Sequence, residues 1–356
     1  MHITSLGITN LRILRDLKIE PCPGINFIVG ENGSGKTSIL EAIYLAGRGR
    51  TFRHSDAGPM IRQGTDNVTV VVETLDPGNG RRSILGIRRE KRSMTCRLDG
   101  KDVKKRSVLV EALPVQWIGS QPQLFLGMGP EVRRRFLDMG MFHVEHTYLD
   151  VLSEFQRNLR QRNAAIRQGK VELVGIWNRP FSLAAGNLHT YREKFVEQLM
   201  NRAIEIHGDW NQGYSLGYRY KAGWNQDTPL LQQLDEKLEM DLRMGFTSRG
   251  PQRAELELTA DSYTAEKKLS RGQQKLLVVA INLALMDLLS RDGRYPPILL
   301  IDDLAAELDQ RNRQRILQEL EHRNGQVFLT KIEETSLAAA NKESKMFHVD
   351  HGALVS

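Results

Sequence analysis

Short apolar segments of the kind that form buried strands occur in the first tenth and in the last fifth of the chain. Residues 25–29 and 298–301 are mainly apolar and rich in β-branched side chains, and 326–330 has the same character. Residues 38–46 carry apolar side chains at helical spacing, and Gly49 lies where the helix should end. These patterns predict an α/β core that is built from both ends of the chain.

The middle of the chain changes character. Apolar and polar residues alternate over 68–110, with turn signals that predict antiparallel hairpins. The pattern over 131–242 is mainly helical, and strand signals return after it. We therefore predict a discontinuous nucleotide-binding lobe of residues 1–126 and 246–356, with a mainly helical lobe of residues 127–245 inserted between its halves.

Composition places the chain among globular proteins. Apolar residues make up 40% and charged residues 26% of the 356 residues, which is ordinary for this class. No apolar run spans a bilayer, the N-terminus lacks a signal-peptide pattern, and Cys22 and Cys96 make no disulfide framework. We therefore expect a cytoplasmic protein without a membrane partner. The net charge of +7 favours a polyanionic partner, although a basic surface kept for solubility is the alternative.

The clearest motif is a glycine-rich loop between the first buried strand and its helix. Glycines let the backbone wrap a phosphate, and the start of the helix presents unpaired N–H groups. Lys36 is placed to reach the β- and γ-phosphates of ATP, and Thr37 to bind Mg²⁺. A glycine-rich turn without a ligand would not explain these two residues. The loop consists of Gly30, Glu31, Asn32, Gly33, Ser34, Gly35, Lys36 and Thr37.

Two aspartates follow directly on the buried strand 298–301. Such a strand lies beside the phosphate-binding loop in this class of protein, which places Asp302 to hold Mg²⁺ directly or through water. Asp303 would point towards the water that attacks the γ-phosphate, so Asp303 and Lys36 are the predicted catalytic residues. An exposed pair of aspartates in a turn is the alternative, and the phosphate-binding loop on the same chain disfavours it.

A third motif, residues 269–274, stands at the start of a helix over 273–289. The Ser270 hydroxyl and the Gly272 N–H, together with the helix N-terminus, would form a second anion site for the nucleotide. Taken alone, the hexapeptide could equally be a helix cap with Ser270 at the N-cap position. Because this motif can reach a nucleotide only from a neighbouring subunit, we predict that ATP closes a homodimer.

The three motifs together resemble those of the ATP-binding-cassette (ABC) head. Over nearly its full length the chain is also similar to the RecF family, in the SMC/Rad50-like branch of these ATPases. The resemblance implies an α/β fold, an ABC-type ATPase head with an inserted helical lobe. It further implies ATP-dependent homodimerisation, binding of single-stranded, gapped or duplex DNA, and action with RecR- and RecO-type mediator proteins. Its other marks are residues 6–12, 51–53, 129–138, 250–253 and 302–309.

The resemblance also assigns roles outside the three motifs. Asp309 would belong to a loop that crosses the dimer interface. Gln121 is our choice for the glutamine that senses Mg²⁺, with Gln116 and Gln123 nearby as alternatives. Arg12, near the first strand, is a candidate to face the adenine.

Two positions depart from the pattern of cassette transporters, which carry Glu in place of Asp303 and His near Lys331. The shorter carboxylate of Asp303 lies about one methylene further from its water, and reacting atoms tolerate little misplacement. We therefore expect a slow, DNA-stimulated ATPase in which ATP acts as a timed clamp. Lys331 is either a replacement sensor or a surface lysine.

Basic residues gather in one stretch of the predicted hairpins. A turn at Asp99-Gly100 would present this stretch as a positive hairpin suited to a phosphate backbone. A solvated edge strand guarded by lysines is the alternative. Arg133-Arg134-Arg135 on the inserted lobe is a further set that either contacts DNA or pairs with acidic neighbours. The predicted DNA-binding residues are Arg88, Arg89, Lys91, Arg92, Lys101, Lys104, Lys105 and Arg106.

The favoured function is an ATP-switched DNA clamp in recombinational gap repair, replication-fork recovery and SOS induction. One alternative is the ATPase subunit of a membrane transporter, which the basic charge and the long inserted lobe disfavour. Another is a chromosome organiser of the SMC type. The stretch 131–242 shows no sustained heptad pattern for the long coiled coils of that type.

Overall fold

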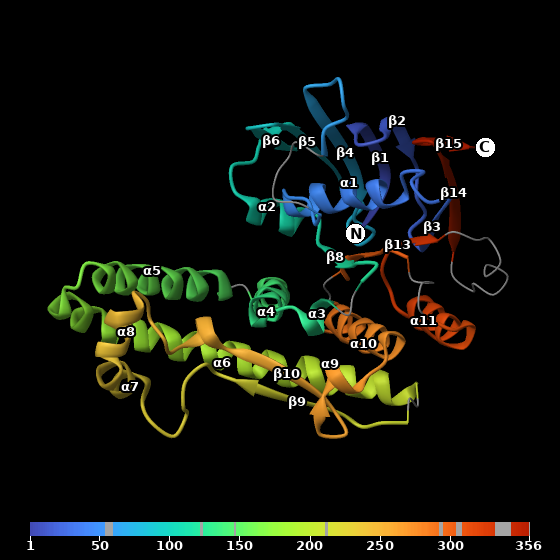
Figure 1. Cartoon of the computed structure of the whole chain (residues 1–356). Coiled ribbons are helices and arrows are strands. Elements are labelled where there is room, and N and C mark those ends of the chain that lie inside the picture. Colours follow the sequence, from blue (N-terminus) through green and yellow to red (C-terminus); the bar gives the residue numbers. More distant parts are fainter. Residues whose placement is uncertain are drawn as a thin grey trace. The chain divides into compact units, whose positions relative to one another are not determined.

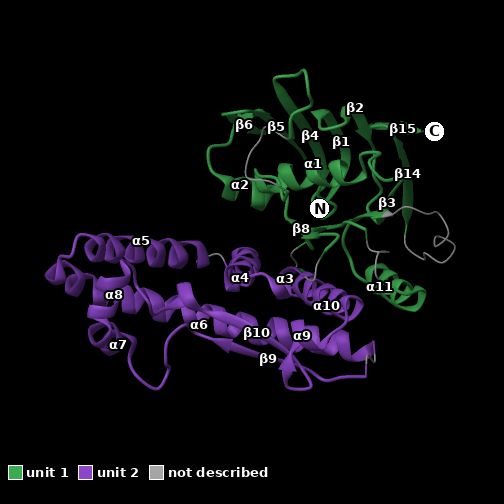
Figure 2. Cartoon of the chain, in the orientation of Figure 1, with its two compact units in different colours: residues 1–122, 289–356 green, residues 123–288 purple. Residues whose placement is uncertain are grey.

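The computed structural model describes residues 1–53, 60–121, 124–145, 147–210, 213–291, 295–303, 308–331 and 343–355. The chain forms two compact units, which Figure 2 shows in different colours. Unit 1 consists of residues 1–122 and 289–356, and unit 2 of residues 123–288. Unit 1 resumes at residue 289, whereas the predicted nucleotide lobe resumes at residue 246, and the limits of that lobe stay a prediction. The difference arises because β10 (Glu255–Ala260) pairs along its length with β9 (Leu216–Lys221), so this segment packs with the insertion.

A mainly parallel sheet carries the functional loops of unit 1. Its strand order is β15-β14-β3-β13-β12-β8, in which β15 alone pairs antiparallel. In a parallel sheet the carboxyl ends of the strands lie at the same edge, so the residues that follow β3, β12 and β13 are brought together. The strands are β3 (Ile25–Val29), β8 (Val115–Ile118), β12 (Ile298–Ile301), β13 (Val327–Lys331), β14 (Ser344–Asp350) and β15 (Ala353–Val355).

The predicted hairpins form a second sheet in unit 1, with the order β2-β1-β4-β5-β6-β7. All of its strands pair antiparallel. Its strands are β1 (His2–Leu11), β2 (Leu14–Ile19), β4 (Asn67–Leu75), β5 (Arg82–Glu90), β6 (Met94–Leu98) and β7 (Lys101–Asp102). The chain continues into α2 (Arg106–Ala112), and α11 (Gln310–His322) belongs to the same unit.

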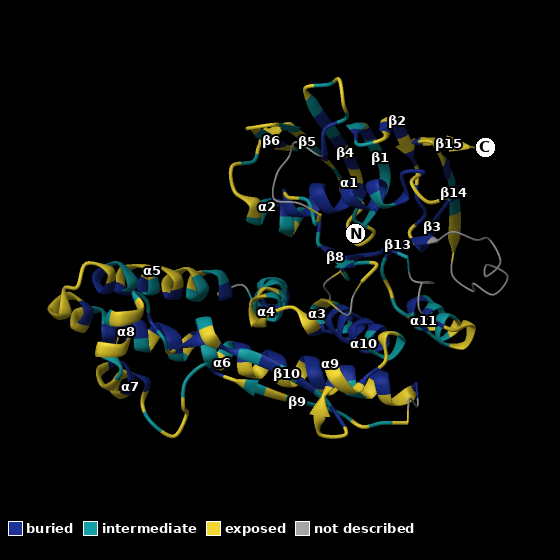
Figure 3. Cartoon of the chain, viewed as in Figure 1, coloured by how far each residue is buried: buried dark blue, intermediate teal, exposed yellow. Residues whose placement is uncertain are grey.

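Helix α1 (Lys36–Arg48) forms the centre of unit 1. Nearly every one of its residues is buried, which Figure 3 shows as a dark blue helix. A helix buried on all sides must have partners on all sides. One hydrophobic cluster accordingly joins Ile39 and Ile43 of α1 to Val70 of the antiparallel sheet and Leu300 of the parallel sheet. The helix that begins at the glycine-rich loop is therefore held by both sheets.

Unit 2 is mainly helical, as predicted for the insertion. Helix α6 carries Pro180 in its interior, and α5 and α6 lie side by side (Figure 1). A small sheet of order β11-β10-β9 completes the unit. The helices are α3 (Leu124–Gly127), α4 (Pro130–Val144), α5 (Tyr148–Arg167), α6 (Val171–Asp209), α7 (Leu230–Glu236), α8 (Leu238–Met244), α9 (Ala265–Lys268) and α10 (Arg271–Leu289). The 3₁₀ turn η2 (Pro251–Arg253) precedes β10, and β11 is Tyr263–Thr264.

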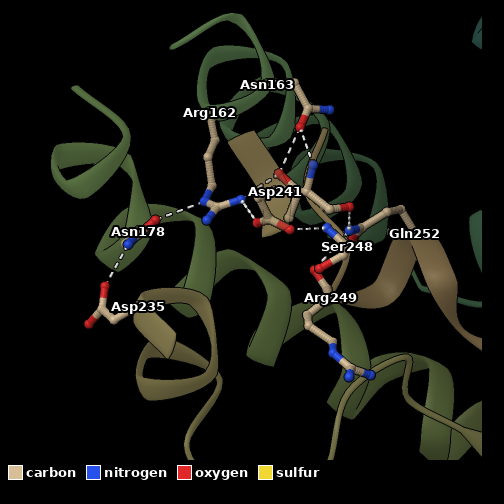
Figure 4. A network of polar contacts seen from close by, with 9 residues as sticks. Arg162, Asn163, Asn178, Asp235, Asp241, Ser248, Arg249 and Gln252 are labelled. Carbon is tan, nitrogen blue, oxygen red and sulfur yellow. Dashed lines mark hydrogen bonds and ion pairs between the residues drawn. The ribbon is translucent and has the colours of Figure 1, made fainter. Parts of the chain in front are cut away.

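A buried polar network fixes the loop before η2 (Figure 4). Arg162 of α5 is fully buried, and its Nη1 donates hydrogen bonds to Asp241 Oδ2 at 2.7 Å and to Thr247 Oγ1 at 2.8 Å. Its Nε donates to Asn178 Oδ1 of α6 at 2.8 Å. Asp241 in turn accepts a bond from Ser248 N at 2.9 Å. One guanidinium therefore ties α5, α6, α8 and the loop into a single arrangement.

Helix α10 is long and apolar enough to cross a membrane, and no other helix among the described residues is. Within its apolar window, 78% of the residues are buried inside the protein. Core helices can be equally long and apolar, so this helix is explained by the interior that it fills.

Candidate functional site

The glycine-rich loop connects β3 to α1 and depends on its glycines. Gly30, Gly33 and Gly35 have φ angles of 156°, 83° and 116°, a region that side chains with a Cβ rarely adopt. A Cβ on Gly30 would lie 2.1 Å from Val349 O, and one on Gly35 would lie 2.8 Å from Leu14 Cδ2. Gly30 and Gly35 are therefore required by close neighbours as well as by their φ angles, and Gly33 by its φ angle alone.

Lys36 closes the loop. Its Nζ donates hydrogen bonds to Gly30 O and Glu31 O, both at 2.7 Å, and the residue is 9% exposed. Burial lowers the pKa of Lys36, while Asp302 and Asp303 act in the opposite direction. These two bonds fix the position of the ammonium group within the loop and use two of its three donors.

The loop also holds a buried hydroxyl that suits a phosphate oxygen. Ser34 is 4% exposed, and its Oγ has no hydrogen-bond partner in the described part of the chain. Buried polar atoms without partners are rare, and a ligand is one common reason for them. The residues present therefore fit a bound phosphate chain.

A hydroxyl and a carboxylate meet at the predicted metal position. Thr37 Oγ1 donates a hydrogen bond to Asp302 Oδ1 at 3.0 Å, and Asp302 is 8% exposed. Both are hard oxygen donors of the type that Mg²⁺ prefers. The described residues contain no cluster of three or more His, Cys, Asp or Glu side chains that could hold a metal ion. The Thr37–Asp302 pair fits Mg²⁺ bound together with phosphates and water, which is its usual mode at nucleotide sites.

Asp303 occupies an unusual backbone conformation beside this pair. Its φ is 50°, and its N–H donates to Thr330 Oγ1 at 2.9 Å. Thr330 Oγ1 donates in turn to Asp302 Oδ1 at 2.8 Å. Thr330 was not among the site residues predicted from the sequence. The available signal was a threonine at the end of an apolar strand that runs parallel to 298–301.

Arg12 binds a buried carboxylate on α1. Its Nε and Nη2 donate to Glu41 Oε2 at 2.5 Å and to Glu41 Oε1 at 3.0 Å. Thr51 Oγ1 also donates to Glu41, and Arg53 Nε lies 3.9 Å from it. Glu41 is fully buried, and it too was not predicted from the sequence. The Arg12 guanidinium is thus engaged with α1, and its contact with an adenine stays a prediction.

The glutamine that senses Mg²⁺ stays unassigned. Gln116 lies inside β8 and is 1% exposed, whereas Gln121 is exposed in the segment that follows β8. Gln123 lies outside the described residues. The position of Gln121 after the end of a parallel strand agrees with our choice without testing it.

Three other predicted positions concern the segments after β12 and β13. Residues 304–307 and the side chain of Lys331 lie outside the described part of the chain. Asp309 is the N-cap of α11, where its Oδ1 accepts a hydrogen bond from Asn312 N at 2.7 Å. Its predicted place in a dimer-spanning loop remains a prediction.

Ser270 caps α10 in unit 2. Gln273 N donates to Ser270 Oγ at 3.3 Å, and Ser270 N donates to Gln273 Oε1 at 3.0 Å. This reciprocal pair is a capping box. Ser270 is exposed and Gly272 is half-buried. The motif therefore performs the helix-capping role that was the alternative, and it leaves Ser270 accessible for the predicted anion contact.

The predicted DNA-binding residues divide between two ends of the hairpin sheet. The turn between β5 and β6 carries Lys91 and Arg92, and Leu98 pairs with Lys101 at the other end of β6. The Val103 N bond to Cys96 O, at 2.8 Å, shows that the chain then runs back along β6. Consequently the β6–β7 turn presents only Lys101 of the predicted DNA-binding residues. The opposite end of β6, next to the β5–β6 turn, carries more of the basic residues.

We call this end the basic edge. A Cβ on Gly49 would lie 3.3 Å from Met94 Cε and 3.5 Å from Arg106 Cγ. Because Met94 is the first residue of β6, Arg106 lies near the start of that strand. Burial raises the pKa of Cys96, while Arg106 and Arg89 act in the opposite direction, which places both arginines near one thiol. The edge consists of Arg89, Lys91, Arg92, Lys104, Lys105 and Arg106, all exposed except the half-buried Arg89.

Ion pairs separate the basic residues further. Arg88 Nε lies 3.4 Å from Glu90 Oε1 on the solvent side of β5. Among the described residues, Lys91, Arg92 and Lys105 have no carboxylate within ion-pair distance. Arg89, Lys104 and Arg106 likewise have none in the described part of the chain, so all six residues of the basic edge are available for an external anion.

The Arg133-Arg134-Arg135 set is mainly structural. Arg133 makes a bidentate ion pair with Glu255 at 2.8 and 3.0 Å and donates to the carbonyls of Phe125, Leu126 and Met128. Arg134 Nη1 donates to Ala254 O at 2.7 Å. Arg135 pairs with Glu131 on the surface of α4. Pairing with acidic neighbours within unit 2 therefore accounts for the charges of Arg133 and Arg135, and a backbone carbonyl holds Arg134.

The parallel sheet with its glycine-rich loop, the Thr37–Asp302 pair and the capped Ser270 motif on an inserted unit define an ABC-type ATPase head. The family profile described as "RecF/RecN/SMC N terminal domain" matches residues 2–354. The chain is 38% identical to "DNA replication and repair protein RecF" of Pseudomonas aeruginosa strain LESB58, over 99% of this chain and 97% of the relative. It is 35% identical to the protein of the same name from Thioalkalivibrio sulfidiphilus, over 99% of both chains. The chain belongs to the RecF family.

Solved structures agree on the fold. "Structure of the recombination mediator protein RecF-ATP in RecFOR pathway" superposes with a TM-score of 0.86 at 21% identity, covering 99% of this chain and 97% of that one. An Smc head domain with an extended coiled coil, bound to a domain of ScpA and derived from Pyrococcus furiosus, has a TM-score of 0.64 at 17% identity, covering 99% and 95%. At these identities the likeness concerns the fold alone, which is that of an ABC-type head.

Proposed function

We propose that this chain is an ATP-dependent DNA clamp of recombinational gap repair, with further roles in replication-fork recovery and SOS induction. ATP binding drives homodimerisation on single-stranded, gapped or duplex DNA, and slow hydrolysis releases the DNA. The membership of the RecF family and the names of the relatives support the repair role. The observation that carries the ATP part is the bond between Thr37 and Asp302, which joins the phosphate-binding loop to the carboxylate after β12.

The nucleotide site assigns a task to each residue. The backbone N–H groups of 33–36 and the Lys36 ammonium bind the β- and γ-phosphates. Thr37 and Asp302 hold Mg²⁺, which neutralises charge on the phosphates when it is bound. Asp303 accepts the hydrogen bond of the attacking water, and its short side chain keeps the reaction slow. ATP therefore sets how long the clamp stays closed.

Dimerisation requires a second surface for the same nucleotide. Ser270 and Gly272 at the start of α10 supply it, each γ-phosphate being bound by Lys36 of one subunit and by Ser270 of the other. The exposed Ser270 hydroxyl supports this arrangement. An arginine at position 270 would place a bulky side chain where the partner's phosphate must lie.

The basic edge is the proposed contact with DNA. Its cations lie on one end of one sheet, and Lys91, Arg92 and Lys105 have no competing carboxylate in the described residues. Contacts to the phosphate backbone carry no sequence information, so binding should depend on DNA structure. RecR- and RecO-type mediators are the proposed protein partners. A similar solved structure is described as a recombination mediator protein "in RecFOR pathway", which supports this choice.

Sedimentation with and without ATP on gapped DNA tests the proposal. The wild-type chain should sediment as a dimer only with ATP or a non-hydrolysable analogue. Ser270→Arg should bind ATP but stay monomeric, and Lys36→Met should bind ATP more weakly and stay monomeric at ATP concentrations that saturate the wild-type chain. If Ser270→Arg still dimerises with ATP, the proposed contact between Ser270 and the partner's nucleotide is wrong. If the wild-type chain stays monomeric with analogue and DNA, ATP-driven dimerisation is wrong.

A further inference from the structure

The hydroxyl of Thr330 connects the two carboxylate residues that follow β12. It accepts a hydrogen bond from Asp303 N at 2.9 Å and donates one to Asp302 Oδ1 at 2.8 Å. Thr330 is 1% exposed and lies in β13, between β12 and β3 in the parallel sheet. A hydroxyl has one proton to donate and two lone pairs, so these bonds use its donor and one acceptor.

The bond to Asp303 N acts on a strained backbone. Asp303 has a φ of 50°, a left-handed conformation that residues with a Cβ rarely adopt. Such conformations persist only where the surroundings hold them, and they gather at functional sites. The Thr330 hydroxyl is one of the contacts that hold this one. Without it, the Asp303 backbone is free to move towards an ordinary conformation, and its carboxylate moves with it.

The bond to Asp302 acts on the orientation of a carboxylate. Asp302 Oδ1 accepts from Thr330 on one side and from Thr37 on the other. The Asp302 N–H is bonded to Ile118 O at 2.9 Å, so the backbone of this residue is also fixed. Outer partners of this kind orient a metal-binding carboxylate and are nearly as important as the ligand itself.

We propose that Thr330 is a positioning residue for ATP hydrolysis, which rests on the proposed function. It holds the Asp302 carboxylate in the orientation that receives Mg²⁺ and keeps Asp303 in the conformation that faces the attacking water. Both hydrogen bonds of the Thr330 hydroxyl go to the two aspartate residues. Its removal should therefore change the rate and the Mg²⁺ requirement while leaving the binding of the phosphates by Lys36 intact.

Thr330→Val is the sharpest variant, because valine has nearly the same shape and lacks the hydroxyl. We expect kcat to fall on the order of 100-fold, since small misplacement of reacting groups has effects of this size. The Mg²⁺ concentration for half-maximal rate should rise, and ATP affinity measured in EDTA should not change. Thr330→Ser restores the hydroxyl and should recover most of the rate. Thr9→Val, at an exposed position of β1, controls for the substitution itself.

Several results would overturn this role. One is a Thr330→Val variant that hydrolyses ATP at the wild-type rate with the wild-type Mg²⁺ requirement, and another is a Thr330→Ser variant as slow as the valine variant. A parallel loss of ATP affinity in EDTA would show a merely structural residue. If the valine variant does not fold, Thr330→Ala and Thr330→Ser give the same comparison. A wild-type chain that binds no ATP would instead refute the proposed function, and Thr9→Val would then fail in the same way.

Discussion

Thr37 Oγ1 lies 3.0 Å from Asp302 Oδ1, although 265 residues separate the two in the sequence. Thr37 is the last residue of the glycine-rich loop and lies in the first turn of α1, and Asp302 follows β12. The pairing depends on the parallel sheet, which places the ends of β3 and β12 at one edge with only β13 between them. Two motifs from opposite ends of the chain thus form one oxygen-rich position next to Lys36.

The first prediction separates phosphate binding from metal binding. Lys36→Met should weaken ATP binding about 10- to 100-fold with or without Mg²⁺, since a charge-assisted hydrogen bond contributes roughly 1.5–3 kcal/mol. Thr37→Val should weaken binding only when Mg²⁺ is present. Titration of a fluorescent ATP analogue in Mg²⁺ and in EDTA measures both. Equal losses for Thr37→Val under the two conditions would contradict the metal role of Thr37.

The second prediction concerns the basic edge. Replacing Lys91, Arg92 and Lys105 with glutamate should weaken DNA binding and lower the slope of log K against log salt. Each phosphate contact that is lost removes about 0.9 from that slope. Lys101→Glu is the matched control, because Lys101 pairs with Leu98 at the opposite end of β6. Fluorescence anisotropy over a range of salt measures the slope. Equal effects from Lys101→Glu and from the triple variant would show that the basic edge is not the contact with DNA.

Much of unit 1 could be predicted from the sequence because its signals are local. Buried strands are recognisable as short β-branched runs, and 25–29 and 298–301 were predicted in this way. The glycine-rich loop is recognisable because its backbone angles require glycine at fixed positions. The hairpins of β4 to β7 follow from alternation and turn residues, whereas the end of the predicted stretch 68–110 forms helix α2 instead.

The parts that could not be predicted depend on contacts between distant segments. Thr330 and Glu41 are ordinary residues in their own segments, and their roles come from partners in other segments. The return to unit 1 at 289 depends on the pairing of β10 with β9, which a strand pattern alone does not reveal. The end of the hairpin sheet that is basic depends on the course of the chain after Lys101, which runs back along β6.

The third prediction concerns the stability of unit 2. Arg162→Met leaves the fully buried Asp241 carboxylate without its cation, which should destabilise the unit by about 3–5 kcal/mol. Arg160→Met, at an exposed position of the same helix, should have little effect. Urea unfolding of both variants measures the difference. A loss at Arg162 no larger than that at Arg160 would show that the network contributes little.

The last prediction concerns acid sensitivity. His207 of α6 is 2% exposed, its Nε2 lies 2.8 Å from Tyr214 Oη, and burial lowers its pKa from 6.5 to about 4. Between these two values the unfolded chain binds a proton that the folded chain does not, so stability falls as the pH drops from 6.5 towards 4. At about 1.4 kcal/mol per pH unit, the full loss is roughly 3 kcal/mol.

Removing the imidazole should remove this part of the pH dependence. His207→Gln keeps a polar partner for Tyr214 and cannot titrate, so the stability of this variant should change less between pH 7 and pH 5 than that of the wild type. His322→Gln, on the exposed surface of α11, is the control and should retain the wild-type slope. Urea unfolding at pH 7 and pH 5 measures the change in stability of each variant. If the His207 variant loses as much stability in acid as the His322 variant, the proton that opposes folding binds elsewhere.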